Sequence, residues 1–161
     1  MILTTHAIVG AAIASLNPSR PVSGFIAGFV VHFILDAIPH WEYKIESGSL
    51  DPDIGSPLVL DRAFFRDVFR IGSDLLLGII FSLILFSSSG SLFAVLAGAL
   101  GGIAPDALQF ACLRLRWRPL IALQNFHYWI HATYKLKKKP VLGIISQVLL
   151  IAAIVFAVRL I

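Results

Sequence analysis

The apolar residues of this chain are gathered into long runs and are not spread at the spacing of an amphipathic helix. Of the 161 residues, 58% are hydrophobic and 14% are charged. A soluble domain is about half apolar and about a quarter charged, and a helix needs about 20 apolar residues to cross a bilayer. The sequence therefore predicts an all-α protein, a polytopic membrane helical bundle built as one domain over residues 1–161.

Polar or turn-forming residues separate five hydrophobic segments. Two longer polar stretches, 40–70 and 114–139, connect the second segment to the third and the fourth to the fifth. The single cysteine, Cys112, excludes an intramolecular disulfide and a thiolate-rich metal site. The five predicted helical segments cover about 3–16, 22–38, 71–86, 92–113 and 141–161.

The basic residues predict how the segments are oriented. Successive spans alternate in direction, and basic residues mark the cytoplasmic side. All 13 Lys and Arg residues except Arg20 and Arg159 fall on one side. We therefore expect a cytoplasmic N-terminus and cytoplasmic connections at 40–70 and 114–139, in the inner membrane of a prokaryote. Topology and anionic membrane phospholipids explain the net charge of +4 better than nucleic acid does.

Ionisable residues lie within or beside these apolar segments, where they are costly and usually mark function. On the predicted topology they converge on the cytoplasmic ends of the helices. Imidazole and carboxylate without thiolate favour zinc, with manganese or iron as alternatives. The set is larger than one tetrahedral shell, which predicts one to three ions. The candidate metal ligands are His6, His32, Asp36, His40, Asp74, Asp106, His127 and His131.

Each candidate also has a structural interpretation. His32 could be a hydrogen-bonded core residue, and Asp74 could cap the start of a helix. Asp106 follows a proline and could stabilise a kink. His127 and His131 could belong to an interfacial aromatic belt, although their four-residue spacing is typical of one helix that offers two imidazoles to one metal.

Four short motifs resemble the YdjM-like membrane-bound metal-dependent hydrolases. They are Thr5-His6, Asp36-Ala-Ile-Pro-His40, Pro105-Asp106, and the later pair His127 and His131. Those hydrolases are similar in ligand pattern to zinc-dependent phospholipase C and the single-strand nucleases of that fold. The resemblance covers roughly residues 1–135 and implies metal-dependent hydrolysis. The family's usual Leu-Pro-Asp-x-Asp is absent here, as is the Arg-containing motif expected near the later His pair.

The leading hypothesis is hydrolysis of a phosphoester in a phospholipid or lipid-linked substrate, reached from the cytoplasmic face. Asp36 or Asp106 would be catalytic, orienting a water molecule or accepting its proton. The alternative is a metal-ion transporter or a non-catalytic metal-binding membrane module. The predicted headgroup-binding residues, whose positions topology explains equally well, are Arg114, Arg116, Arg118 and Lys135.

Overall fold

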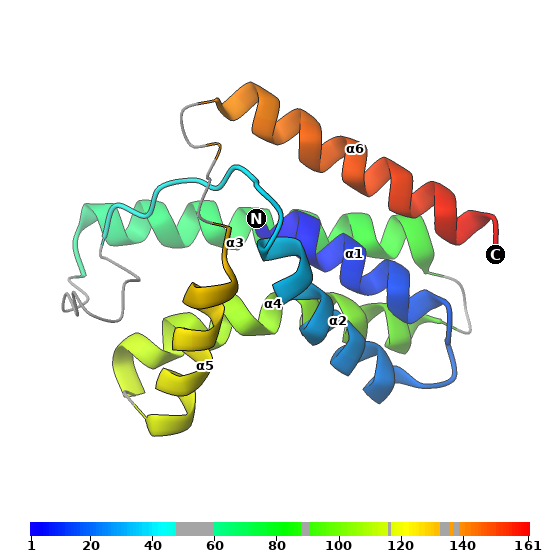
Figure 1. Cartoon of the computed structure of the whole chain (residues 1–161), viewed down its shortest axis with the longest axis horizontal. Coiled ribbons are helices and arrows are strands. Elements are labelled where there is room, and N and C mark those ends of the chain that lie inside the picture. Colours follow the sequence, from blue (N-terminus) through cyan, green and yellow to red (C-terminus); the bar gives the residue numbers. More distant parts are fainter. Residues whose placement is uncertain (48–59, 88–90, 116, 133–135, 137–138) are drawn as a thin grey trace.

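The structure is a computed structural model that describes residues 1–47, 60–87, 91–115, 117–132, 136 and 139–161, without the side chains of 113 and 114. Within these ranges the chain forms six helices and no strand (Figure 1). The all-α prediction is therefore confirmed. The helices are α1 (Leu3–Ser15), α2 (Pro21–Asp36), α3 (Arg62–Phe86), α4 (Leu92–Leu115), α5 (Arg118–Ile130) and α6 (Pro140–Arg159).

Three of these helices, α3, α4 and α6, are long and apolar enough to cross a membrane. The two N-terminal helices, α1 and α2, are apolar but have only 13 and 16 residues, fewer than the about 20 that a full crossing takes. The described residues thus contain three candidate membrane spans by length and composition, which indicates a helical membrane protein.

Two helices differ from the predicted segments. The third was expected to begin at 71, but α3 begins at Arg62, where the Asp61 side chain caps it by accepting a hydrogen bond from the Phe64 N–H at 2.9 Å. In addition, α5 lies inside the stretch 114–139 that was predicted as a connection. The N-terminal part of α3 and the whole of α5 mix polar and apolar residues. Neither contains a continuous apolar run, so the sequence pattern did not indicate a membrane segment there.

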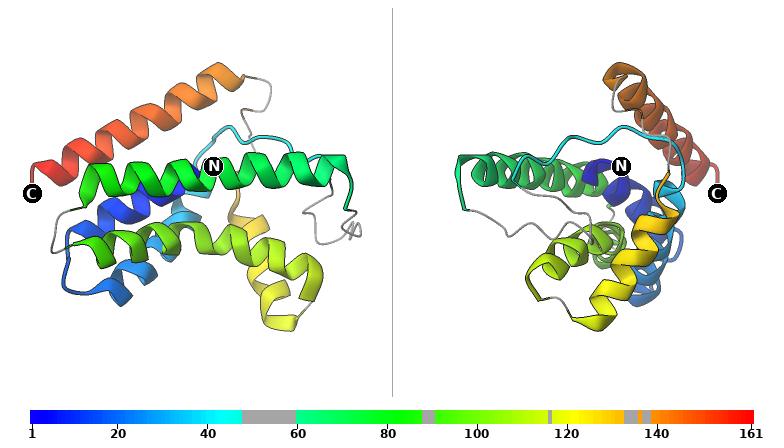
Figure 2. Two further views of the ribbon diagram at one scale, coloured as in Figure 1. Left: turned by 180° about the vertical axis from the view of Figure 1, so that it is seen from behind. Right: turned by 60° about the vertical axis from the view of Figure 1, so that its left-hand side comes forward.

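Helix α1 lies at the centre of the bundle, with most of its residues buried. It packs against α2, α3, α4 and α6. Figures 1 and 2 show that α1, α3 and α6 run in one direction and α2 and α4 in the other. The N-terminal half of α3 and the whole of α5 extend beyond one end of this bundle, at the left in Figure 1.

Glycines on α4 allow its backbone to approach α1 and α2 closely. A Cβ atom on Gly98 would clash with the carbonyl oxygen of Gly10, and one on Gly102 would clash with that of His6. Small residues at helix contacts in membrane proteins permit such close packing. The glycines therefore bring His6, and with it the start of α1, against the middle of α4.

Candidate metal centre

The carboxylate of Asp36 lies at the centre of a cluster that contains all five histidines of the chain. Each histidine places its Nε2 atom within 4 Å of one Asp36 oxygen. Asp36 is 1% exposed, so this is a buried site. Oδ1 is 3.2 Å from His6 and 3.8 Å from His40, whereas Oδ2 is 2.8 Å from His127, 3.1 Å from His32 and 3.9 Å from His131.

Helix α2 and the turn after it supply three of these side chains. His32 and Asp36 lie four residues apart and so occupy successive turns of one helix face. The helix ends at Asp36, and Pro39 cannot continue it because proline lacks the backbone N–H. The backbone turns at Ala37 and Ile38, and His40 still faces the Asp36 carboxylate.

Two backbone hydrogen bonds fix the end of α5 against this turn. The Ala132 N–H donates to the Asp36 carbonyl at 2.8 Å, and the Leu136 N–H donates to the His40 carbonyl at 3.0 Å. His127 lies in the last turn of α5 and His131 directly follows the helix. The pairing therefore holds both imidazoles against the end of α2, although the two segments are far apart in sequence.

Two groups in the described residues have ligand geometry, and they share Asp36. Within each group, one ligand atom per residue lies within 4.8 Å of all the others. A buried cluster of imidazole and carboxylate groups is thus positioned to bind a metal ion. The first group is His32, Asp36, Asp106 and His127, and the second is Asp36, His40 and His131.

The hydrogen bonds of two histidines fit a metal ion. The Nδ1 atoms of His32 and His40 lie 2.7 Å from the carbonyl oxygens of Gly102 and Ile38. A carbonyl oxygen can only accept, so both Nδ1 atoms carry a proton, and in each ring the Nε2 atom faces Asp36. In the neutral form of this tautomer, Nε2 carries the lone pair that binds a metal ion. Such Nδ1–carbonyl contacts typically orient histidine metal ligands.

His6 gives a second indication that the site suits a cation. It is fully buried, and neither ring nitrogen hydrogen-bonds to any residue that the structure describes. A buried polar atom without a partner is costly, and coordination by Nε2 would remove that cost. The positively charged amino group of Met1 already contacts the same region, 2.7 Å from Asp36 Oδ1 and 3.0 Å from His40 Nε2.

The cluster is partly open to solvent. The side chains of Asp106, Glu42 and His131 are 29%, 23% and 15% exposed, whereas the other members are nearly or fully buried. Glu42 Oε2 lies 3.5 Å from His131 Nε2 and 3.7 Å from His40 Nε2. Carboxylates at an open edge can orient a water molecule or accept its proton. Sequence patterns did not single out Glu42 as a ligand, because it lies in a polar stretch where acidic residues are common.

The expectation that Asp74 is a metal ligand is not supported, because its carboxylate is engaged elsewhere. It accepts hydrogen bonds from the backbone N–H groups of Leu3 at 2.7 Å and Thr4 at 3.1 Å. These N–H groups lack partners within their own helix, so Asp74 caps α1 from the neighbouring helix. It also accepts a hydrogen bond from the Tyr43 hydroxyl at 3.2 Å. Burial, and next the Asp74 charge, raise the pKa of Tyr43, which therefore remains a donor.

The predicted headgroup residues are not brought to the cluster by any described contact. Arg118 is the first residue of α5, at the opposite end of that helix from His127. The Arg114 side chain, Arg116 and Lys135 lie outside the described residues.

A buried amide that sequence analysis missed helps to fix the site. The Gln147 side chain, on α6, accepts hydrogen bonds from the Ile2 N–H at 3.2 Å and the Thr5 hydroxyl at 3.0 Å. Its NH₂ group donates to the Trp41 carbonyl at 2.9 Å. Gln147 therefore joins the start of α1 to the segment that follows His40. A large polar side chain within an apolar span is the sequence signal that identifies it.

Comparison with known proteins identifies no relative of this chain. The resemblance to YdjM-like hydrolases therefore stays a prediction carried by the motifs, and the metal centre rests on its geometry. No protein-family model, curated protein or solved structure matches the chain.

Proposed function

We propose that this protein is a membrane-embedded, metal-dependent hydrolase that cleaves a phosphoester of a phospholipid or lipid-linked substrate. The observation that carries the proposal is the sharing of Asp36 between two ligand groups. In the first group, His32 and His127 face Oδ2. In the second group, His40 faces Oδ1 and His131 faces Oδ2. Enzymes that cleave phosphoesters commonly hold two metal ions about 3.5–4 Å apart, and a shared carboxylate suits such a pair.

Zinc is the proposed metal, because the donors are imidazole and carboxylate groups, with manganese or iron as alternatives. When bound, divalent ions polarise the phosphoryl group and activate water for attack. Asp36 is buried at the centre of the cluster, so we assign it as a ligand and not as the base. Asp106 lies at the open edge, 3.7 Å from His32 Nε2, and we assign it to orient the attacking water or accept its proton.

We further propose that α1 and α2 are embedded with the three longer helices, giving five membrane helices with a cytoplasmic N-terminus. The alternating directions of α1, α2, α3, α4 and α6 support this arrangement. The basic residues then place the cluster at the cytoplasmic face of a prokaryotic inner membrane.

A metal-ion transporter is the alternative that the cluster supports less well. A path across the bilayer needs ligands at successive depths, whereas the two ligand groups share one carboxylate and so lie at one depth. A non-catalytic metal-binding module differs from the hydrolase only in lacking turnover, which makes turnover the deciding measurement.

The test combines metal analysis with an assay of the purified protein in detergent. We expect bound zinc by plasma mass spectrometry and release of a phosphorylated headgroup from phosphatidylglycerol in mixed micelles. Asp106→Asn should lower kcat by at least about 100-fold, the usual contribution of a general base, and should keep at least one zinc. The matched control Asp61→Asn, at the exposed cap of α3, should behave like the wild type. Metal-loaded protein that hydrolyses no phosphoester would leave a non-catalytic module, and protein that binds no metal would remove the proposal.

A further inference from the structure

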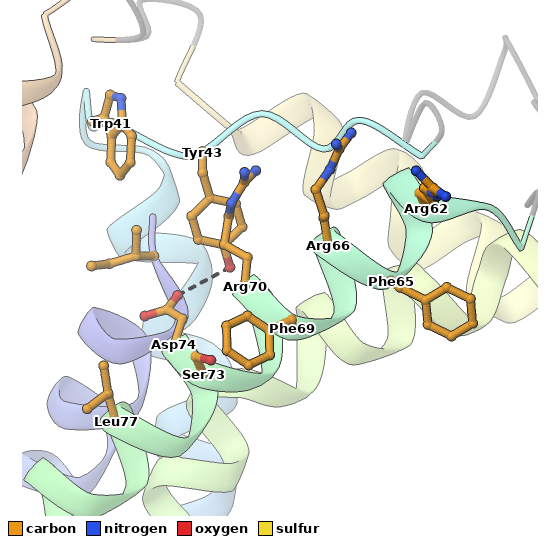
Figure 3. Close-up of a pocket in the computed structure, with 11 residues that line it drawn as sticks. Trp41, Tyr43, Arg62, Phe65, Arg66, Phe69, Arg70, Ser73, Asp74 and Leu77 are labelled. Carbon is orange, nitrogen blue, oxygen red and sulfur yellow. Dashed lines mark hydrogen bonds between the residues drawn. The ribbon is translucent and has the colours of Figure 1, made fainter.

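A large groove lies beside the metal centre, between the N-terminal half of α3 and the segment that follows His40. Its volume is about 940 Å³, and Trp41 and Tyr43 form one side of it (Figure 3). A second cavity of about 750 Å³ shares both aromatic residues and Arg70 with the first. The shared lining makes the two cavities neighbouring parts of one surface.

The α3 side of the groove combines cationic and apolar side chains at helical spacing. Arg62, Arg66 and Arg70 are four residues apart and therefore lie along one helix face. Figure 3 shows these arginines along the side of α3 next to the Trp41–Tyr43 segment. Phe65 and Phe69 alternate with them and are 64% and 78% exposed. A row of guanidinium groups beside exposed aromatic rings matches a ligand with an anionic end and a hydrocarbon part.

Most of the ion pairs that these arginines form are exposed, so an anion can compete for the guanidinium groups. Arg66 donates to Glu46 at 2.6 Å, and Arg70 lies 3.7 Å from the same carboxylate. Arg62 and Arg66 are exposed and Arg70 is partly exposed, and exposed ion pairs contribute little stability. Arg70 also lies 3.7 Å from the buried Asp67 carboxylate. That carboxylate keeps two other partners, because it accepts hydrogen bonds from the backbone N–H groups of Glu46 and Ser47. Arg62 forms no ion pair with any described residue. Guanidinium groups bind phosphate oxygens through two parallel hydrogen bonds, so a phosphate competes well for this row.

Glu42 connects the groove to the metal centre. It lines the second cavity together with Lys44 and Arg70. Its Oε2 atom is also 3.5 Å from the Nε2 atom of His131, and His131 belongs to the second ligand group. A phosphate beside Arg70 therefore lies next to a carboxylate that faces the candidate metal ligands.

We infer that this groove binds a phosphate-bearing anionic lipid, with its phosphate on Arg62, Arg66 and Arg70 and its hydrocarbon chain over Phe65 and Phe69. This assigns the headgroup site to the three arginines of α3. The sequence had predicted it at Arg114, Arg116, Arg118 and Lys135. That the lipid is the substrate rests on the proposed function, whereas its binding here does not.

The test measures binding of phosphatidic acid by native mass spectrometry of the detergent-purified full chain. The groove variant is Arg62→Gln/Arg66→Gln/Arg70→Gln. The matched control, Arg20→Gln/Arg118→Gln/Arg159→Gln, removes the same charge from exposed sites outside the groove lining. We expect the groove variant to lose at least about tenfold in affinity, as the loss of bidentate contacts implies, and the control to bind like the wild type. Equal losses in both would show attraction to net charge alone, and no loss in the groove variant would overturn the site.

Two further measurements identify the ligand class. Phosphatidylcholine should bind weakly because its headgroup has no net charge. Phe65→Ser/Phe69→Ser, which changes only exposed rings, should weaken phosphatidic acid binding and leave the binding of inorganic phosphate unchanged. Inorganic phosphate that binds as tightly as phosphatidic acid would overturn the lipid assignment in favour of a free-phosphate site.

Metal content separates this inference from the hydrolase proposal. The groove variant should keep the wild-type zinc content, and Asp36→Asn should lose zinc but still bind phosphatidic acid. Wild-type protein that binds phosphatidic acid and zinc without hydrolysing a phosphoester would sink the hydrolase and leave the lipid site intact. Wild-type rates of phosphoester hydrolysis in the groove variant would keep the hydrolase and show that the lipid bound in the groove is not its substrate.

Discussion

Asp36 Oδ2 and His127 Nε2 lie 2.8 Å apart, although 91 residues separate them in the chain. The contact joins the last residue of α2 to the last turn of α5. His32 Nε2 lies 3.2 Å from the same His127 nitrogen. Two imidazole nitrogens and a carboxylate oxygen thus face one point, and these atoms could hold a metal ion.

Replacing Asp36 with asparagine should abolish metal binding. Asparagine keeps the size of the side chain but removes the charge that both ligand groups share. We expect zinc content to fall by about 100-fold or more at fixed free zinc, beyond the about 10–100-fold that follows loss of an outer-shell partner. Asp61→Asn is the matched control. Normal zinc content in Asp36→Asn, measured by plasma mass spectrometry, would contradict the shared-ligand assignment.

Replacing His6 with leucine separates a metal ligand from a packing residue. The wild-type ring buries two nitrogens that make no hydrogen bond in the described part of the chain. Leucine removes their desolvation cost of about 1–3 kcal/mol, so metal-free protein should unfold at the same or a higher temperature. The increase in Tm on adding zinc should shrink, because a ligand is gone. An unchanged zinc-induced shift would show that His6 only fills space.

Replacing Gly102 with alanine should disrupt the bundle. The new Cβ would clash with the backbone carbonyl of His6, which cannot move without displacing α1. We expect a loss of about 1–3 kcal/mol, as for other overpacked cores, visible as a lower Tm in detergent. The matched control is Gly72→Ala on α3, where nothing lies within 4 Å of the added Cβ. That control should be neutral or stabilising by up to about 1 kcal/mol, and equal effects of the two substitutions would argue against close α1–α4 packing.

Replacing Asp74 with alanine should destabilise α1 without removing a metal ligand. The carboxylate caps the N–H groups of Leu3 and Thr4, and loss of a helix cap costs about 0.5–2 kcal/mol. We therefore expect a lower Tm together with unchanged zinc stoichiometry below the unfolding transition. Asp61→Ala, at the cap of α3, gives the effect of removing an exposed cap. Loss of zinc from folded Asp74→Ala would restore Asp74 to the ligand set.

The sequence alone determined the helical membrane class and most of the cluster. Long apolar runs can satisfy backbone hydrogen bonds in lipid only as helices, so helices were predicted at all five segments. Ionisable residues such as His32 and Asp36 are too costly in such runs to be incidental, which identified them as site residues. Both an apolar run and an ionisable residue inside it can be recognised within a single segment, so neither requires knowledge of the tertiary structure.

Only the tertiary structure decided how these residues are used. Asp74 and Asp106 look alike in sequence, yet Asp74 caps α1 and Asp106 joins the ligand cluster. The difference depends on where α3 and α4 meet α1, which is set by close contacts at Gly78 on α3 and at Gly98 and Gly102 on α4. Glu42 lies in a polar stretch, so the only signal for it in the sequence was its nearness to His40, which made it a possible base. Its role depends on the packing of α5 against the end of α2, and contacts between distant segments leave no periodic pattern in the sequence.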